Sequence, residues 1–214
     1  MTKIIYLIFA VLSVFGFTAC EDNLSSVEST EFTYDWANRN LTYFNERMAE
    51  AKQAINEAKA AHGDNWEEHC DWRTYLSYSK VEGVNILDSI CVKIIDRGEG
   101  TESPLFTDQA MINYVGHLIP TENHPKGFAF DHSGLYSEDD YVFNPAFAAP
   151  RPMIVGNTVE GFSTALQYMH KGDRWMIYMP SILGFGSIAK PAIPPYSTLV
   201  FDVQLVSFKN IGVN

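Results

Sequence analysis

Residues 171–208 constrain the fold most strongly, because two alternating segments flank a long, stiff loop. Larger apolar side chains alternate with others in residues 173–179 and again in residues 198–208, so each segment predicts a strand with one buried face. Residues 180–195 contain four prolines and two glycines, which exclude a regular hydrogen-bonded ladder. A loop of this length inside a compact domain is usually functional, and its apolar side chains suit the lip of a pocket.

Composition and charge limit the class of protein. The chain has 214 residues, of which 46% are hydrophobic and 19% charged, and this predicts a folded domain with an extension rather than a disordered protein. A net charge of -11 argues against nucleic acid as a partner, because phosphates require a basic surface.

The N-terminus has the features of a targeting segment. Lys3 precedes an apolar run over residues 4–17, which is short for a membrane-spanning helix. The run ends in Phe17-Thr-Ala-Cys20, which resembles a bacterial lipoprotein processing site. That resemblance implies a signal peptide over residues 1–19, a lipid on Cys20, a tether over 20–33, and an exported protein anchored to a membrane of the cell envelope. The alternative is a secreted protein that is cleaved near Ala19.

Residues 34–62 predict one long amphipathic helix. Its apolar residues recur at steps of three and four and therefore share one face; they are Ala37, Leu41, Phe44, Met48, Ala51, Ile55 and Ala58. We expect this face to pack in cis against the rest of the chain, and the alternative is dimerisation through the helix. A second, shorter helix is expected over residues 65–79, because Asn65 can cap it and two glutamates suit its first turn.

The spacing of the cysteines and histidines does not indicate a metal site. If Cys20 is lipidated, Cys70 and Cys91 remain, and in an exported chain they are either a disulfide or two free thiols. Neither has the spacing of a zinc site. His124 and His132 lie close to Asp131 in sequence but match no metal signature, so we expect no metal.

Further short strands are expected from residue 84 onward, and they carry two motifs. The segments 89–95, 109–119, 127–133 and 152–155 predict strands, and residues 159–169 predict a short helix. The step Y-x-G ends at Gly116, and the sequence F-D-H-S begins at Phe130. Downstream, P-x-x-L-x-F-G occupies residues 180–186 and I-P-P-x-S-T-L-x-F-x-V-x-L occupies residues 193–205.

Together these motifs resemble the FKBP-type peptidyl-prolyl cis/trans isomerases, over residues 84–208. The resemblance implies an α+β fold, in which a half-open antiparallel β-sheet wraps around a short helix. A helical extension over residues 34–82 would precede an isomerase domain over residues 83–210. The activity implied is rotation about X–Pro bonds in proline-containing polypeptide clients, with no cofactor.

The resemblance also implies roles for particular residues. Asp131 and Tyr114 would be the catalytic pair, and the proline pocket would be lined by Phe130, Val159, Phe162, Phe185, Ile193 and Phe201. Without the resemblance, these aromatic residues would be expected to form an ordinary core.

Four departures from the family pattern affect the expected activity. Phe162 stands where the family commonly has tryptophan, and Phe185 stands where it has a tyrosine hydroxyl that donates to the substrate. Met153 and Val155 replace aromatic residues, and no arginine closely follows Asp131. The alternatives are therefore a non-catalytic binding module with the same fold, or a structural surface lipoprotein whose helix docks to a neighbour.

Overall fold

The computed structural model describes residues 30–80, 85–134 and 149–212, and a seven-stranded sheet with only antiparallel pairings lies at its centre. Its order is β1-β2-β6-β7-β3-β4, and β5 also pairs with β3. The strands are β1 (Trp72–Leu76), β2 (Ser89–Asp96), β3 (Gln109–His117), β4 (Ala129–His132), β5 (Arg151–Ile154), β6 (Arg174–Met179) and β7 (Leu199–Lys209). The helices are α1 (Trp36–His62) and α2 (Glu160–Leu166), and short 3-10 turns lie at Thr30–Phe32, Gly63–His69, Ile86–Asp88, Val155–Asn157 and Ser181–Leu183.

One face of the sheet packs on α2. Successive side chains of a strand point to opposite faces, so one alternate set from each strand enters this core. Ile90 of β2, Ile177 of β6 and Val203 of β7 are fully buried there, together with Leu166 of α2. The predicted α+β arrangement, an antiparallel sheet around a short helix with a long helix before it, is confirmed.

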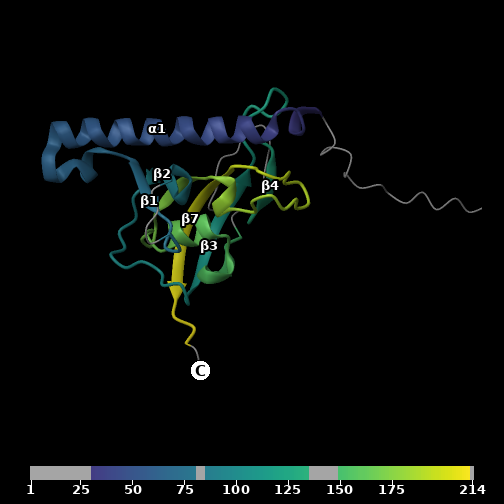
Figure 1. Cartoon of the computed structure of the whole chain (residues 1–214). Coiled ribbons are helices and arrows are strands. Elements are labelled where there is room, and N and C mark those ends of the chain that lie inside the picture. The colour runs from purple at the N-terminus through teal and green to yellow at the C-terminus, as the bar shows by residue number, and fades with distance from the viewer. Residues whose placement is uncertain (1–29, 81–84, 135–148, 213–214) are drawn as a thin grey trace, which may run out of the picture.

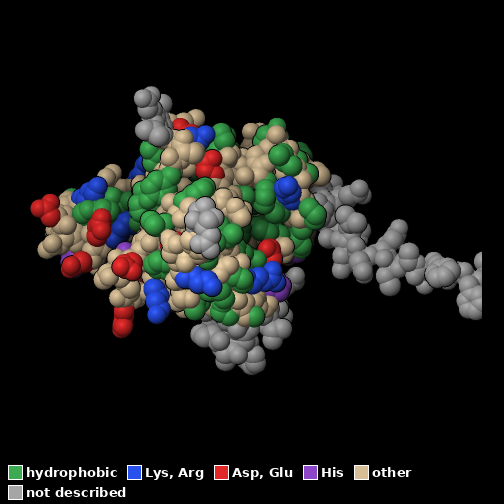
Figure 2. All heavy atoms as spheres, turned by 90° about the horizontal axis from the view of Figure 1, so that it is seen from below, with side chains coloured by type: hydrophobic (Ala, Val, Ile, Leu, Met, Phe, Trp, Pro, Cys, Tyr) green, Lys and Arg blue, Asp and Glu red, His purple; other side chains and the backbone are tan. Residues whose placement is uncertain are grey.

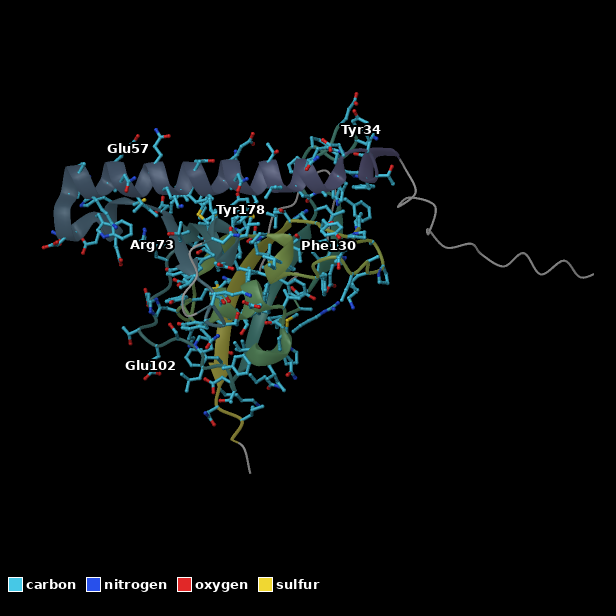
Figure 3. The ribbon with its side chains drawn as sticks, viewed as in Figure 1. Tyr34, Glu57, Arg73, Glu102, Phe130 and Tyr178 are labelled. Atoms are coloured by element: carbon cyan, nitrogen blue, oxygen red, sulfur yellow. The ribbon has the colours of Figure 1, made fainter. Side chains whose placement is uncertain are left out.

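The other alternate set packs beneath α1, which runs across the sheet in Figure 1. Phe44 and Met48 of α1 are buried against Trp72 of β1 and Cys91 of β2, and Tyr178 of β6 packs against the same cluster. Figure 3 shows Tyr178 beneath the helix and Glu57 on its outer side. The expectation that the apolar face packs in cis is confirmed.

The first turns of α1 differ from the prediction. Ala37 and Leu41 were expected on the buried face, but both are exposed, and Trp36 and Asn40 are buried instead. The buried side rotates here because the start of the helix leaves the sheet and contacts the segment before β7, where Asn40 accepts a hydrogen bond from the backbone N–H of Thr198. Helical periodicity alone carries no information about such a change of partner.

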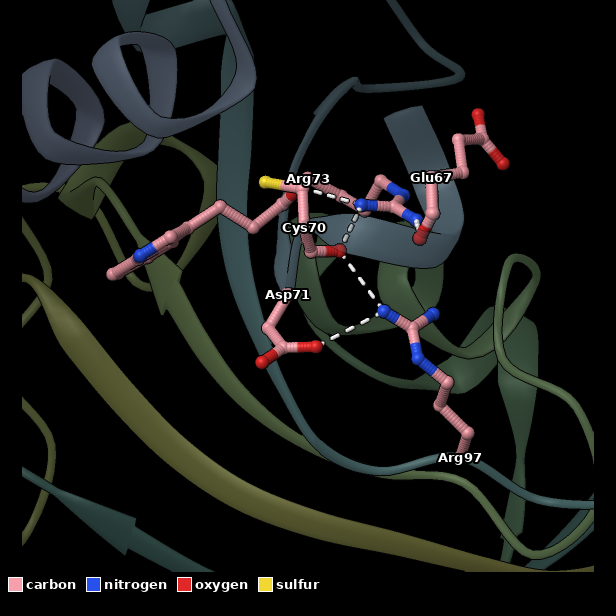
Figure 4. Close-up of polar contacts among 6 residues, drawn as sticks. Glu67, Cys70, Asp71, Arg73 and Arg97 are labelled. Carbon is pink, nitrogen blue, oxygen red and sulfur yellow. Dashed lines mark hydrogen bonds and ion pairs between the residues drawn. The ribbon is translucent and has the colours of Figure 1, made fainter. Parts of the chain in front are cut away.

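The prediction of a second helix over residues 65–79 is wrong. A 3-10 turn ends at His69, and the chain then enters β1, which pairs with β2 from Trp72 to Leu76. Aromatic and β-branched residues favour a strand once an unpaired edge is available, and tertiary pairing overrides the weak helical pattern. The buried guanidinium of Arg73 fixes the junction by donating to the carbonyls of Glu67, Cys70 and Trp72, each at 2.7 Å (Figure 4).

Both remaining cysteines in the described residues are buried free thiols, so the disulfide alternative is not present. Burial raises the pKa of the Cys91 thiol to about 12, which makes it a poor nucleophile. Within the described ranges, no helix is both long and apolar enough to span a bilayer. On the face shown in Figure 2, acidic and basic side chains are interspersed with hydrophobic ones.

Candidate active site

Four aromatic side chains from four different elements meet at the edge of the α2 core. Tyr114 comes from β3, Phe130 from β4, Phe162 from α2 and Phe201 from β7. The ring centroid of Phe201 lies 4.8 Å from that of Phe162, 5.4 Å from that of Phe130 and 6.4 Å from that of Tyr114. Such edge-to-face and tilted contacts make a rigid apolar surface.

Gly116 on β3 permits this convergence. A Cβ atom at position 116 would lie 2.6 Å from ring atoms of both Phe130 and Phe201, which is closer than real contacts allow. The Y-x-G step therefore has a steric reason, because the glycine lets two rings of the cluster approach the strand backbone.

Asp131 lies at the rim of this cluster, where β4 pairs with β3. Its Oδ2 accepts a hydrogen bond from the Tyr114 hydroxyl at 2.7 Å, and its Oδ1 accepts one from the backbone N–H of His132 at 2.9 Å. The Arg151 guanidinium on β5 lies 3.8 Å from Oδ1. Burial, and then the hydrogen bond to Asp131, raise the pKa of Tyr114 well above its usual range, so the phenol stays a donor throughout the neutral range.

The charged partner of Asp131 could not be predicted from the sequence. No arginine closely follows Asp131 in sequence, yet Arg151 reaches it from β5 because β4 and β5 both pair with β3. The missing arginine directly after Asp131 therefore does not leave this carboxylate without a charged neighbour. Only the pairing of strands distant in sequence could have revealed the contact.

The remaining candidate residues surround the same core. Val159, at the N-terminus of α2, and Phe185 are half-buried against it, while Ile193 is almost fully buried. The ammonium of Lys190 lies 5.5 Å from the centroid of the Phe185 ring. Cys20, the candidate lipidation residue, lies outside the described residues.

The long loop before β7 has a defined conformation. A 3-10 turn covers Ser181–Leu183, and Lys190 and Ile193 exchange two backbone hydrogen bonds of 3.0 Å each. Ala192 and Tyr196, on either side of the Ile-Pro-Pro sequence, both adopt left-handed backbone conformations, with φ of 63° and 62°. The loop therefore presents Ile193 to the core and leaves Tyr196 on the surface.

Among the residues that the structure describes, no group of three or more His, Cys, Asp or Glu side chains could hold an ion. His124 stacks on Phe32 and packs edge-on against Phe128, so its ring has a structural role between the N-terminal segment and the β3–β4 hairpin.

Comparison with known proteins identifies the family. Residues 100–206 match the family model described as FKBP-type peptidyl-prolyl cis-trans isomerase, and this segment contains all eight candidate pocket and catalytic residues. The chain belongs to this family.

Individual relatives agree with this assignment. The chain is 31% identical to the FKBP-type 22 kDa peptidyl-prolyl cis-trans isomerase of Escherichia coli, over 80% of this chain and 72% of the relative. It is 31% identical to the macrophage infectivity potentiator of Trypanosoma cruzi, over 61% and 59%, and 29% identical to FkpA of E. coli, over 79% and 55%. The chain thus spans little more than half the length of the last two relatives.

Proposed function

We propose that this FKBP-type chain catalyses cis/trans isomerisation of X–Pro bonds in proline-containing envelope or surface proteins. The observation that carries the proposal is the aromatic cluster of Tyr114, Phe130, Phe162 and Phe201 beside the hydrogen bond from Tyr114 to Asp131. Phe185, Val159 and Ile193 would complete the walls of the proline pocket.

The chemistry needs no nucleophile or cofactor. Rotation about an X–Pro bond has a barrier of roughly 20 kcal/mol, because the planar amide loses resonance as it twists. An apolar surface that removes water from the amide, and fits the twisted form better than either planar form, lowers this barrier. Asp131 and Tyr114 would then act at the carbonyl of the twisting bond, where the charge distribution changes most.

A protease-coupled assay with a proline-containing tetrapeptide tests this proposal. We expect micromolar protein to accelerate the slow phase, which reports cis-to-trans conversion, and rapamycin to abolish the acceleration. An unchanged slow phase would overturn the proposal.

A second candidate is a non-catalytic binding module. It is favoured by Phe185, which lacks a hydroxyl to donate to the substrate carbonyl, and by Phe162, which lacks an indole N–H. Tight rapamycin binding without turnover would support this candidate over the first.

We also propose that the chain is exported and anchored by a lipid on Cys20, with residues 1–19 removed and a tether that ends before the 3-10 turn at Thr30–Phe32. The helical extension begins at residue 34 but ends before residue 82, because Trp72–Leu76 is already strand β1 of the sheet, so the isomerase domain that extends to residue 210 begins earlier than residue 83. The proposal rests on the sequence, because residues 1–29 lie outside the described part. A dimer formed through α1 would have to use its exposed side, since the apolar side is buried in cis. Mass spectrometry of the membrane fraction tests the anchor, and an unmodified soluble protein would refute it.

A further inference from the structure

The start of α1 contacts the loop that carries Ile193, and the contact is built from buried polar groups. The Asn40 side chain is 1% exposed. Its Oδ1 accepts the backbone N–H of Thr198 at 2.8 Å, and its Nδ2 donates to the carbonyl of Trp36 at 2.8 Å. The Thr198 hydroxyl donates in turn to the backbone carbonyl of Asn40 at 3.0 Å. Helix and loop are therefore joined by two hydrogen bonds across 158 residues of sequence.

A second connection runs from Trp36 to the Ile-Pro-Pro sequence. The indole N–H of Trp36 donates to the Ser197 hydroxyl at 2.9 Å, and that hydroxyl donates to the carbonyl of Pro194 at 2.7 Å. These two hydrogen bonds therefore connect Trp36 to Pro194, the residue that directly follows Ile193. A shift of the helix start would therefore move the backbone that presents Ile193 to the core.

The same segment also contacts the other side of the pocket. The Phe32 ring lies 5.3 Å from that of Trp36 and 5.9 Å from that of Phe128, on the hairpin that leads to Phe130 and Asp131. Glu31 accepts a hydrogen bond from the Asn123 side chain at 2.8 Å, on the same hairpin. The N-terminal segment thus contacts both the loop that carries Ile193 and the hairpin that carries Phe130 and Asp131.

The loop needs such support because its backbone is strained. Ala192 and Tyr196 adopt left-handed conformations that residues with a side chain rarely occupy. Such conformations persist only where the surroundings impose them. Residues 193–198 are held from the helix side by Trp36 and Asn40, and a groove of about 600 Å³ separates the helix start from the outer part of the loop.

We propose that Trp36 and Asn40 are positioning residues for catalysis, because they hold residues 193–198 in the conformation that forms one wall of the proline pocket. The proposal rests on the proposed isomerase function. It makes the N-terminal helix a support for the substrate site, in addition to a stabilising element of the fold.

The test compares Asn40→Ala with Ile55→Ala. Ile55 lies in the distant half of α1 and is buried in the same cluster between α1 and the sheet as Phe44 and Met48. Both variants are measured well below their melting temperatures. For Asn40→Ala we expect the exchange of the Thr198 amide to accelerate at least tenfold, because its buried acceptor is lost. We expect the KM for a proline tetrapeptide and the Kd for rapamycin to rise several-fold, with kcat changed less.

A matched pair at the loop sharpens the test. Thr198→Val removes the hydroxyl at nearly constant volume, whereas Thr198→Ser keeps the donor to the Asn40 carbonyl. We expect Thr198→Val to weaken rapamycin binding in the same direction as Asn40→Ala, and Thr198→Ser to restore it. Trp36→Phe keeps the ring, loses the N–H, and should show an intermediate effect.

The outcomes separate this proposal from the proposed function. If the wild type is active and Asn40→Ala keeps the wild-type KM and rapamycin affinity, the positioning role is overturned. It is also overturned if Ile55→Ala, at equal loss of stability, raises KM as much as Asn40→Ala does. A wild type that neither turns over peptide nor binds rapamycin refutes the function instead, and unchanged Thr198 exchange in Asn40→Ala would then still refute the positioning.

Discussion

The hydrogen bond from Tyr114 to Asp131 can be tested by a double-mutant cycle. The perturbations are Tyr114→Phe, Asp131→Ala and the two combined, because each single variant removes the contact and the cycle isolates the coupling between the side chains. The bond is 2.7 Å long and its acceptor is a carboxylate, which makes it one of the stronger kinds of hydrogen bond.

The structure sets the size of the expected coupling. A hydrogen bond to a charged group contributes about 1.5–3 kcal/mol when it is buried. The Asp131 side chain is 51% exposed, so water replaces much of the lost interaction, and we expect a coupling of about 1–1.5 kcal/mol. The ion pair of Asp131 with Arg151 is 3.8 Å long and both side chains are about half exposed, so its coupling should stay below about 0.5 kcal/mol.

The assay is kcat/KM for a proline tetrapeptide, with unfolding in urea measured in parallel. We expect Tyr114→Phe to lower kcat/KM by about five- to tenfold, the equivalent of about 1–1.5 kcal/mol. The double variant should be no worse than Asp131→Ala alone, while Arg151→Ala should cost less than about threefold. Additive effects of Tyr114→Phe and Asp131→Ala, or a larger loss from Arg151→Ala, would refute the reasoning.

Three further predictions follow from the same structure. Phe44→Ala should lower the free energy of unfolding by about 3–5 kcal/mol, because it leaves a cavity between α1 and the sheet. Leu41→Ala, on the exposed side of the same helix, should change it by less than about 0.5 kcal/mol. Equal effects of the two variants in urea unfolding would contradict the packing of α1. Phe185→Tyr restores a donor for the substrate carbonyl and should raise kcat/KM about two- to tenfold in the peptide assay, and no gain would mean that position 185 does not face the substrate. Burial raises the pKa of Tyr75 to about 12 and raises that of Tyr178 further, both above the ordinary 10.0 of the unfolded chain. The stabilisation that these phenols give is complete below pH 10 and is lost as the pH rises toward 12, so the urea midpoint should fall over that range, and a flat profile would contradict the burial.

Much of the isomerase domain could be predicted because its signals are local. Alternation in β6 identifies its buried side chains, and the family motifs identify Tyr114, Phe130 and Phe201. In β7, by contrast, residues 199–203 are buried on both faces, which alternation does not predict. The glycine at position 116 belongs to one of these family motifs, although the steric reason for it is the approach of the Phe130 and Phe201 rings from two other strands.

What could not be predicted depends on contacts between distant segments. The capping residue Asn65 and the two glutamates after it predict a helix that would include residues 72–76, yet these residues pair with β2 because its edge is available. Asn40 is polar and therefore was not assigned to the buried face, although its amide is satisfied by Thr198. Arg151 reaches Asp131 only through the pairing of β5 with β3.

The packing of α1 shows that the helix is part of the domain rather than a separate arm. A helix with an unpartnered apolar side would be a spacer or a dimerisation arm, but here Phe44 and Met48 are fully buried against the sheet. The helix therefore folds as part of the same unit as the pocket. Truncations that remove it are expected to destabilise the domain rather than release it intact.

The central claim is that the cluster around Phe201 forms a working proline site, and exchange spectroscopy by NMR tests it most directly. Uncatalysed cis/trans exchange of a proline peptide takes tens to hundreds of seconds, so exchange cross-peaks at sub-second mixing times require a catalyst. We predict that substoichiometric protein produces these cross-peaks and that rapamycin removes them. Their absence at equimolar protein would contradict the account.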